Sequence, residues 1–182
     1  MMAIHRSAAL AALLAVAACG GQARGPGGTK LTDPTASASL FDTAGARIGL
    51  ATFTESAGAA QLGISVSGLK PGTHGMHIHE NGACNVPSFE SAGPHFNPAG
   101  KKHGLENSAG PHAGDLPNLV AREDGSADTT FTVATSLLTR GAGSMIGEQK
   151  RAFVIHSDPD DQRTDPSGNS GSRVVCGVIE RR

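Results

Sequence analysis

Apolar and polar residues alternate along several short segments of the chain, and this period of two predicts β-strands. In the first half of the chain the predicted strands are Ala36–Phe41, Arg47–Glu55, Ala60–Ser67 and Thr73–Glu80. In the second half they are Leu119–Arg122, Thr129–Val133, Lys150–His156 and Arg173–Ile179. Turns that contain glycine, as near Gly45 and Gly58, separate neighbouring strands and favour antiparallel pairing.

Two long segments, Asn81–Leu116 and Ser157–Ser172, show no strand periodicity. A structureless stretch of this length within a compact domain is usually functional or disordered. Because the first segment holds several side chains that can bind metals, we interpret it as functional. The pattern predicts an all-β fold, an eight-stranded antiparallel Greek-key barrel or sandwich with two long loops.

The first residues have the features of an export signal. Met1–Arg6 carries a positive charge, and the apolar run Ala8–Ala15 that follows is too short to span a bilayer. The sequence Val16-Ala17-Ala18-Cys19 is similar to a bacterial lipobox, in which the cysteine is acylated and becomes the mature N-terminus. The alternative is an ordinary signal peptide cleaved near Ala18, with Cys19 an incidental thiol.

A segment rich in glycine, proline and threonine follows Cys19 and predicts a flexible tether. The expected organisation is a signal peptide at 1–18, a tether at 19–35 and one domain at 36–182. This arrangement would place the protein in the periplasm, with contact to a membrane only through lipid on Cys19.

The composition is typical of a globular protein without a nucleic-acid partner. Fifteen basic residues are balanced by 16 acidic ones, so no basic excess is present to bind a phosphate backbone. Hydrophobic residues make up 38% of the chain, and 25 glycines add to the apolar total, which argues against disorder of the whole chain. Eight histidines, with no tryptophan or tyrosine, are the unusual feature.

The chain has three cysteines, at positions 19, 84 and 176. If Cys19 carries lipid, Cys84 and Cys176 remain to form a disulfide in an oxidising compartment. Closing a loop of this length would contribute up to about 4.6 kcal/mol on the chain-entropy model. The alternative is two free buried thiols.

The histidines have spacings that indicate metal binding. His77 and His79 are two positions apart, so on a strand both imidazoles lie on one face. The other potential ligands are His95, His103, His112, Asp115 and His156. Imidazoles with one carboxylate suit zinc, and an all-imidazole set suits copper. The alternative interpretation is surface and loop histidines that bind no metal.

Five ordered motifs resemble the copper/zinc superoxide dismutase family. They are Gly75-Met76-His77-Ile78-His79-Glu80, Gly93-Pro94-His95-Phe96-Asn97-Pro98, His103–Asn118, Val154-Ile155-His156 and Gly168–Ile179. The resemblance covers about Ala36 to Arg182. It implies a redox enzyme that converts superoxide to dioxygen and hydrogen peroxide, with one copper and one zinc per chain.

The resemblance also implies a role for each ligand. The copper ligands would be His77, His79, His95 and His156, and the zinc ligands would be His95, His103, His112 and Asp115. His95 would bridge the two metals as an imidazolate, since the two imidazole nitrogens can bind separately. The zinc site would be structural, whereas the copper site would carry out the redox chemistry.

Further residues are assigned by the same resemblance. Arg173 would line the channel above copper as an anion-attracting group, the alternative being a surface salt bridge. Ser167 stands where the family usually has threonine, and would keep a hydroxyl in the channel. Asp160 or Asp161 would supply the carboxylate that links a copper ligand to a zinc ligand. His74 is expected to be a structural hydrogen-bonding residue.

The second long loop departs from the family pattern. It is shorter than in many eukaryotic members, and Asp165-Pro166 stands where such members have a lysine. Steering of superoxide would therefore be weaker or rest on Arg163, Lys150 or Arg151.

The competing function is an exported copper/zinc-binding protein without dismutase activity. The presence of all four copper ligands and of Arg173 favours the enzyme. The sequence leaves the oligomeric state open, and a homodimer is one of the outcomes.

Overall fold

The computed structural model describes residues 35–56, 59–133, 144 and 149–182. The predicted signal peptide, Cys19 and all of the predicted tether except residue 35 lie outside the described residues. Within the described ranges, no helix is long and apolar enough to cross a membrane.

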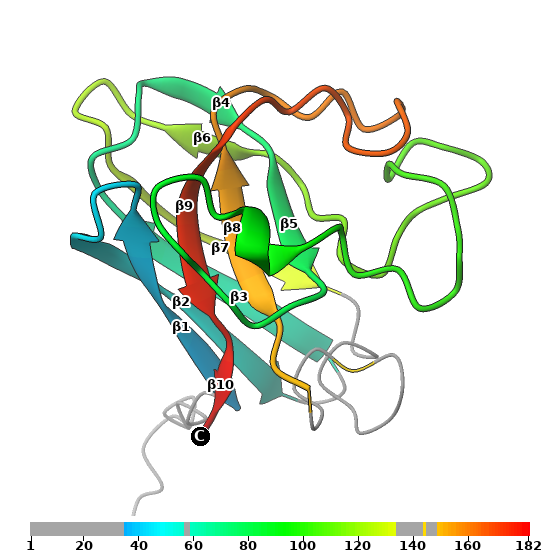
Figure 1. The fold of residues 1–182 in the computed structure, drawn as a ribbon, viewed down its shortest axis with the longest axis horizontal. Coiled ribbons are helices and arrows are strands. Elements are labelled where there is room, and N and C mark those ends of the chain that lie inside the picture. The colour runs from blue at the N-terminus through cyan, green and yellow to red at the C-terminus, as the bar shows by residue number, and fades with distance from the viewer. Residues whose placement is uncertain (1–34, 57–58, 134–143, 145–148) are drawn as a thin grey trace, which may run out of the picture. The chain divides into compact units, whose positions relative to one another are not determined.

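The described residues form ten strands and one short 3-10 helix, so the prediction of an all-β fold is confirmed (Figure 1). The first five strands are β1 (Ala36–Asp42), β2 (Arg47–Ser56), β3 (Ala59–Val66), β4 (Gly72–His74) and β5 (Met76–His79). The others are β6 (Leu119–Ala121), β7 (Ala127–Val133), β8 (Ala152–His156), β9 (Arg173–Val178) and β10 (Glu180–Arg181). The 3-10 helix η1 spans Glu90–Ala92, inside the first long loop.

Every strand pairing among the described residues is antiparallel. One curled sheet has the order β5-β8-β9-β1-β2-β3-β7, with β10 pairing β1, and β4 pairs β6 in a second, two-stranded sheet (Figure 1). Strands β7 and β8, consecutive in the chain, lie far apart in the first sheet. Such a crossing connection is the feature that distinguishes a Greek key from a meander.

The predicted strand Thr73–Glu80 is divided at Gly75, where the chain passes from the second sheet to the first. Gly75 lies so close to the second long loop that a Cβ there would come within 2.8 Å of the Ser170 Cβ and 3.1 Å of the Asp160 Cβ. Its N–H donates to Asp158 O (2.8 Å) and its carbonyl accepts from His156 N (2.9 Å). The break therefore comes from contacts distant in sequence, which strand periodicity does not register.

The main hydrophobic core lies on the inner face of the curled sheet. Its large fully buried side chains include Leu40, Phe53, Leu62, Ile64, Met76, Ile78, Leu116, Leu119, Phe153 and Ile155. The outward-facing residues of β1 to β3 are polar or partly exposed, as the period of two predicts. Burial of apolar area on this face provides most of the driving force for folding.

Strand β8 is buried on both faces and separates two clusters. Phe153 and Ile155 pack into the main core, whereas Ala152 and Val154 face a second cluster with Phe89, Ala92, Cys84 and Cys176. In the antiparallel register, His77 lies opposite Val154 and His79 opposite Ala152. Directly paired residues share a face of the sheet, so His77 and His79 lie on the side of the second cluster.

Cys84 and Cys176 form a disulfide, so the predicted pairing is confirmed and the alternative of two free thiols is wrong. The bridge joins the first long loop to β9. It thus closes a long loop, which restricts the unfolded chain, and it fixes one end of the segment that precedes His95.

Candidate metal centre

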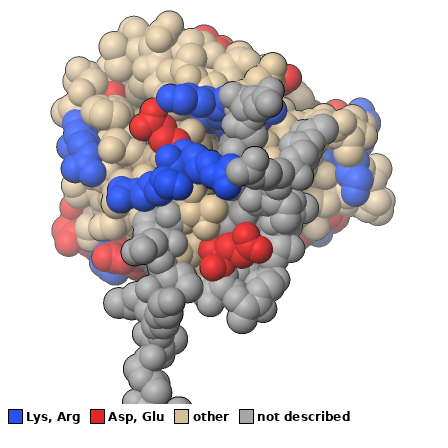
Figure 2. Space-filling view, turned by 90° about the horizontal axis from the view of Figure 1, so that it is seen from below, with Lys and Arg blue, Asp and Glu red and all other residues tan. Residues whose placement is uncertain are grey.

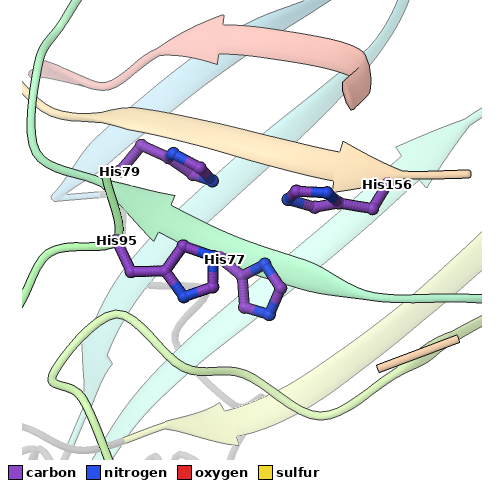
Figure 3. A group of neighbouring side chains, drawn as sticks. All are labelled: His77, His79, His95 and His156. Carbon is purple, nitrogen blue, oxygen red and sulfur yellow. The ribbon is translucent and has the colours of Figure 1, made fainter. Parts of the chain in front are cut away.

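Four imidazole rings from different parts of the chain meet on the outer face of β5 and β8 (Figure 3). His77 and His79 come from β5, His156 from the end of β8 and His95 from the first long loop. One ring nitrogen of each lies within 4.8 Å of the others, and all four side chains are buried. Figure 3 shows His79 and His156 pointing toward each other across this face.

Each strand-borne ring is oriented by a hydrogen bond from one nitrogen. His77 Nε2 lies 2.7 Å from Asp160 Oδ2, and His79 Nδ1 lies 2.8 Å from Gly93 O. His156 Nδ1 lies 3.2 Å from Gly171 O. Because the acceptors are oxygens, the bonded nitrogens are the N–H donors, and the opposite nitrogens keep free lone pairs.

Those opposite nitrogens are buried and have no hydrogen-bond partner in the described structure. They are His77 Nδ1, His79 Nε2 and His156 Nε2, with His103 Nδ1 and His112 Nδ1 in the same condition on the neighbouring loop. A buried polar atom without a partner is unfavourable and requires an explanation. A metal ion accepts lone pairs from several such atoms at once, so the residues present fit metal binding.

A second group converges on one oxygen of Asp115. His103 Nδ1, His95 Nδ1 and His112 Nδ1 lie 3.0, 3.2 and 3.3 Å from Asp115 Oδ1. A tetrahedral ion with bonds of about 2.0 Å separates its ligand atoms by about 3.3 Å. The other oxygen, Oδ2, accepts N–H groups from Gly104 (2.8 Å) and His112 (2.9 Å), so Oδ1 remains available as a ligand.

His77, His95, His103 and Asp115 also have ligand atoms within 4.8 Å of one another. His77 Nε2 already donates to Asp160, however, and its other nitrogen faces the group with His79 and His156. His112 Nδ1, by contrast, is unpartnered beside Asp115 Oδ1. We therefore place His112 in the second group and His77 in the first.

His95 belongs to both groups and lies between them. Its ring stacks on that of His77 with centroids 3.8 Å apart, while its Nδ1 faces Asp115. The first loop brings it there by running along the edge of β5, where Ile78 N donates to Gly114 O and Phe96 N donates to Ile78 O, both at 2.8 Å. The loop therefore runs beside β5 twice, and it places His95 next to His79 and Asp115 next to His77.

Asp160 links the two groups, and Asp161 does not. The Asp160 carboxylate accepts from His77 Nε2 through Oδ2 (2.7 Å) and from His103 Nε2 through Oδ1 (3.0 Å). Asp161 is exposed and accepts backbone N–H groups from Arg163 and Thr164 within its own loop. Gly168 packs so closely on Asp160 that any Cβ there would overlap the carboxylate, and its φ of +61° also favours glycine.

The electrostatics of the metal-free protein follow from burial and from the two carboxylates. Burial lowers the pKa of His77 to about 4, although its hydrogen bond to Asp160 opposes the shift. Burial likewise lowers the pKa of His79 to about 2 and that of His156 to about 3. Burial also acts to lower the pKa of His103, but the adjacent carboxylates of Asp115 and Asp160 outweigh it and raise that pKa to about 9.

The other predicted site residues are placed as follows. Arg173 donates from Nη1 to Phe89 O (2.8 Å) and from Nη2 to Gly93 O (2.7 Å), and it pairs with no carboxylate in the described part of the chain. Ser167 is half-buried in the second long loop. His74 directs its ring nitrogens at the carbonyls of His156 and Lys70, both at 2.7 Å, and is not in either ligand group.

The three cations considered for steering are engaged elsewhere. Lys150 pairs with Glu180 (2.8 Å), and Arg163 pairs with Glu106. Arg151 is buried, donates to Glu80 O (2.8 Å) and lies over the Phe96 ring. A cavity of about 490 Å³ adjoins His95 and His112, and it is lined by charges of both signs, namely Lys101, Arg151, Glu80 and Asp165.

Sequence reasoning did not identify several positioning groups. Asn118 holds the Asp160 backbone through two hydrogen bonds, at 2.8 and 2.9 Å. Asp165 accepts from His103 N (2.8 Å) and Lys102 Nζ (2.9 Å), and so ties the second loop to the first. Neither residue carries a spacing signal, because each acts across about 40 to 60 positions of sequence.

The fold and this centre define an all-β protein with two adjoining ligand groups that share one histidine. A family model described as copper/zinc superoxide dismutase matches residues 47–179. A relative from Aquifex aeolicus, named copper/zinc superoxide dismutase 2, is 44% identical over 149 residues, covering 81% of this chain and 87% of the relative. The chain belongs to the copper/zinc superoxide dismutase family.

Two further relatives extend the comparison. The copper/zinc superoxide dismutase of Deinococcus radiodurans is 42% identical over 166 residues, covering 82% of this chain and 86% of that protein. A solved structure of a superoxide dismutase-like protein from Bacillus subtilis aligns with a TM-score of 0.74 and 40% identity, covering 78% of this chain and 96% of that one.

Replacing Asp160 with asparagine should weaken metal binding, because the amide cannot accept from both His77 and His103. We expect the affinity to fall by about 10- to 100-fold, the usual effect of losing a group that orients metal ligands. Competition with a chelator measures the metal affinity of each protein. The matched control is Asp161→Asn, which should bind metal as the wild type does, and an equal loss in both variants would contradict the assignment.

The metal-free protein should lose stability as the pH falls from about 6.5 toward 5. The folded-state pKa values of His77, His79 and His156 are lowered, so the unfolded chain takes up protons that the folded chain rejects. Each contributes up to about 1.4 kcal/mol per pH unit. His103 acts in the opposite sense, since its contribution is complete below about pH 6.5 and is lost as the pH rises through its folded pKa of about 9.

Urea unfolding of the metal-free protein at pH 7, 6 and 5 measures this dependence. The variant His79→Gln removes one of the titrating rings, so its slope should be shallower. A stability that is flat over this range would show that the rings are not held neutral by burial.

Proposed function

We propose that this chain converts superoxide to dioxygen and hydrogen peroxide at a copper site joined through His95 to a structural zinc site. The observation that carries the proposal is the set of buried, unpartnered imidazole nitrogens facing one another. Membership of the copper/zinc superoxide dismutase family supports the same reaction and the same two metals.

His77, His79, His95 and His156 would hold copper, and His95, His103, His112 and Asp115 would hold zinc. When bound, copper supplies the one-electron redox couple of the reaction and zinc a fixed structural charge. The all-imidazole set suits copper, and the set with one carboxylate suits zinc. Asp160 would fix the ring orientation in both sets, because it binds one histidine of each.

Arg173 would attract and orient the superoxide anion. Its guanidinium is held by two carbonyls and carries a charge that no carboxylate in the described residues neutralises. Its charge reaches the copper set, since it adds to the effect of burial in lowering the pKa values of His79 and His156. A fixed, positively charged fork suits a small anion.

The reaction also requires protons, because hydrogen peroxide carries protons that superoxide lacks. His95 is the least buried ring of the copper set, at 8% exposed against 0 to 4% for the others. Its Nδ1 faces Asp115, which leaves Nε2 to hold and release a proton on the side of His77 and His79.

The competing function is an exported metal-binding protein. A Bacillus subtilis relative, 48% identical over 118 residues, is named a superoxide dismutase-like protein rather than a dismutase. The complete ligand set and the uncompensated Arg173 favour the enzyme, because a metal buffer needs no group that attracts a small anion.

The protein is also proposed to be exported and held by lipid on Cys19. The Cys84–Cys176 disulfide is typical of proteins from oxidising compartments. The tether would leave the domain beside β10, since Arg182 N donates to Thr35 O (3.1 Å). On the described surface at that end, basic and acidic side chains adjoin each other (Figure 2), so attachment would depend on the lipid rather than on charge.

Purified protein loaded with copper and zinc should contain one of each metal per chain and consume superoxide. His156→Ala should lose copper and activity but retain zinc, because His156 belongs only to the copper set. Metal analysis and a superoxide assay measure both, with protein quantified by amino-acid analysis because tryptophan and tyrosine are absent. Two bound metals without activity would favour the metal-binding protein.

Expression of the full chain in a bacterial host should place the protein in the membrane fraction, with an acylated Cys19 as the mature N-terminus. Cys19→Ser should release it into the soluble exported fraction. Mass spectrometry of the mature N-terminus distinguishes the two cases. An unmodified Cys19 in soluble wild-type protein would support the ordinary signal peptide.

A further inference from the structure

Phe89 has a backbone conformation that is rare for a large side chain. Its φ of 56° and ψ of 18° place it in the left-handed region, immediately before η1. Contact between Cβ and the backbone disfavours this region for residues other than glycine. Such outliers persist where the surroundings hold them, and they gather at functional sites.

The surroundings of Phe89 are the second hydrophobic cluster. The ring is 0% exposed and packs with Ala92, Ala152, Val154 and Cys176, with Cys84 at the edge of the cluster. Strand β8, strand β9 and the disulfide thus enclose the ring. Its burial therefore fixes the position of the Phe89 backbone relative to the sheet.

The Phe89 carbonyl faces Arg173. It accepts from Arg173 Nη1 at 2.8 Å and from Ala92 N at 3.0 Å. The other terminal nitrogen of Arg173 donates to Gly93 O, which also accepts from His79 Nδ1. Because Phe89 and Gly93 flank η1, this one turn presents both carbonyls that hold the guanidinium.

Filling space does not by itself account for the left-handed backbone. Phe53 and Phe153 are also fully buried, and both lie in strands with ordinary conformations. What distinguishes Phe89 is that its carbonyl is an acceptor for Arg173. The conformation reconciles two demands, a ring directed into the cluster and a carbonyl directed at the guanidinium.

We propose that Phe89 is a positioning residue for Arg173: its buried ring holds the left-handed backbone whose carbonyl fixes the guanidinium. The packing of a single apolar side chain then sets how strongly the site attracts a small anion. This inference rests on the proposed function only in assigning the anion to Arg173.

The test compares Phe89→Ala with the wild type, in full-length protein loaded with copper and zinc. Azide is the anion probe, and its affinity is measured from the copper absorption band. We expect Phe89→Ala to weaken azide binding by about threefold to tenfold, the size of a weakened hydrogen bond to a charged group. Phe89→Leu, which keeps apolar volume in the cluster, should restore most of the affinity, with both metals retained in each variant.

Two controls separate positioning from general destabilisation. Phe53→Ala makes the same truncation in the main core and should leave azide affinity unchanged. Phe89→Gly removes the ring but accepts the left-handed backbone without strain, so it serves if Phe89→Ala does not fold, and it should show the same loss. Wild-type azide affinity in Phe89→Gly, or an equal loss in Phe53→Ala, would overturn the proposal.

A second measurement does not depend on copper. In the copper-free protein loaded with zinc, nitrogen NMR should show separate signals for the two terminal nitrogens of Arg173, because each is bonded to its own carbonyl. Loss of the ring should let the guanidinium rotate and merge them, and unchanged signals in Phe89→Ala would contradict the proposal. Absence of dismutase activity in the wild type would instead contradict the proposed function. It would leave unaffected the NMR evidence that Phe89 positions Arg173.

Discussion

The structure depends on one constraint, the burial of six imidazole rings and two carboxylates in a small volume. Each polar atom taken out of water needs a partner, and the chain provides partners for only part of them. His77, His79, His103 and His156 each bond one nitrogen to a carboxylate or carbonyl and leave the other unpartnered. The site is therefore incomplete without a group that accepts lone pairs, and a metal bound there would add to the stability of the folded chain.

This constraint also explains how two long loops acquire a fixed structure without strand pairing between them. Asp160 in the second loop accepts a hydrogen bond from His103 Nε2, and Asp115 in the first loop lies 3.0 Å from His103 Nδ1, so this ring joins the loops. Backbone N–H groups also donate to these carboxylates, from Gly104 to Asp115 and from Gln162 to Asp160. Apolar packing also holds the first loop, through Phe89 and Ala92 in the second cluster, whereas around His103 polar contacts join the two loops. These polar groups therefore maintain both loop structure and the geometry of the proposed ligands.

The features that could be predicted from the sequence are those that follow from local periodicity, namely the strands and the faces of their side chains. Alternation located the strands because most of them bury one face, and the two-residue spacing of His77 and His79 predicted their common side of β5. It could not choose between Asp160 and Asp161, since adjacent carboxylates in a loop differ only in how the backbone turns. Contacts from Asn118 and the close approach of Gly168 decide that turn. Phe89 was missed for a related reason, because its role lies in a carbonyl, which every residue possesses.

Strand β8 connects the proposed metal ligands with Arg173, the proposed anion-attracting group. Its alternate residues pack into the two clusters, so the strand cannot shift toward one without losing contacts in the other. His156 ends this strand and is paired in register with Arg173 of β9, next to an irregularity between Ile155 and His156. The ligand and the guanidinium therefore share a backbone ladder, while the disulfide and Phe89 hold the loop that supplies the acceptors of Arg173. Because β8 packs into the main core on one face and into the second cluster on the other, apolar packing on both sides holds the strand that carries His156 beside Arg173.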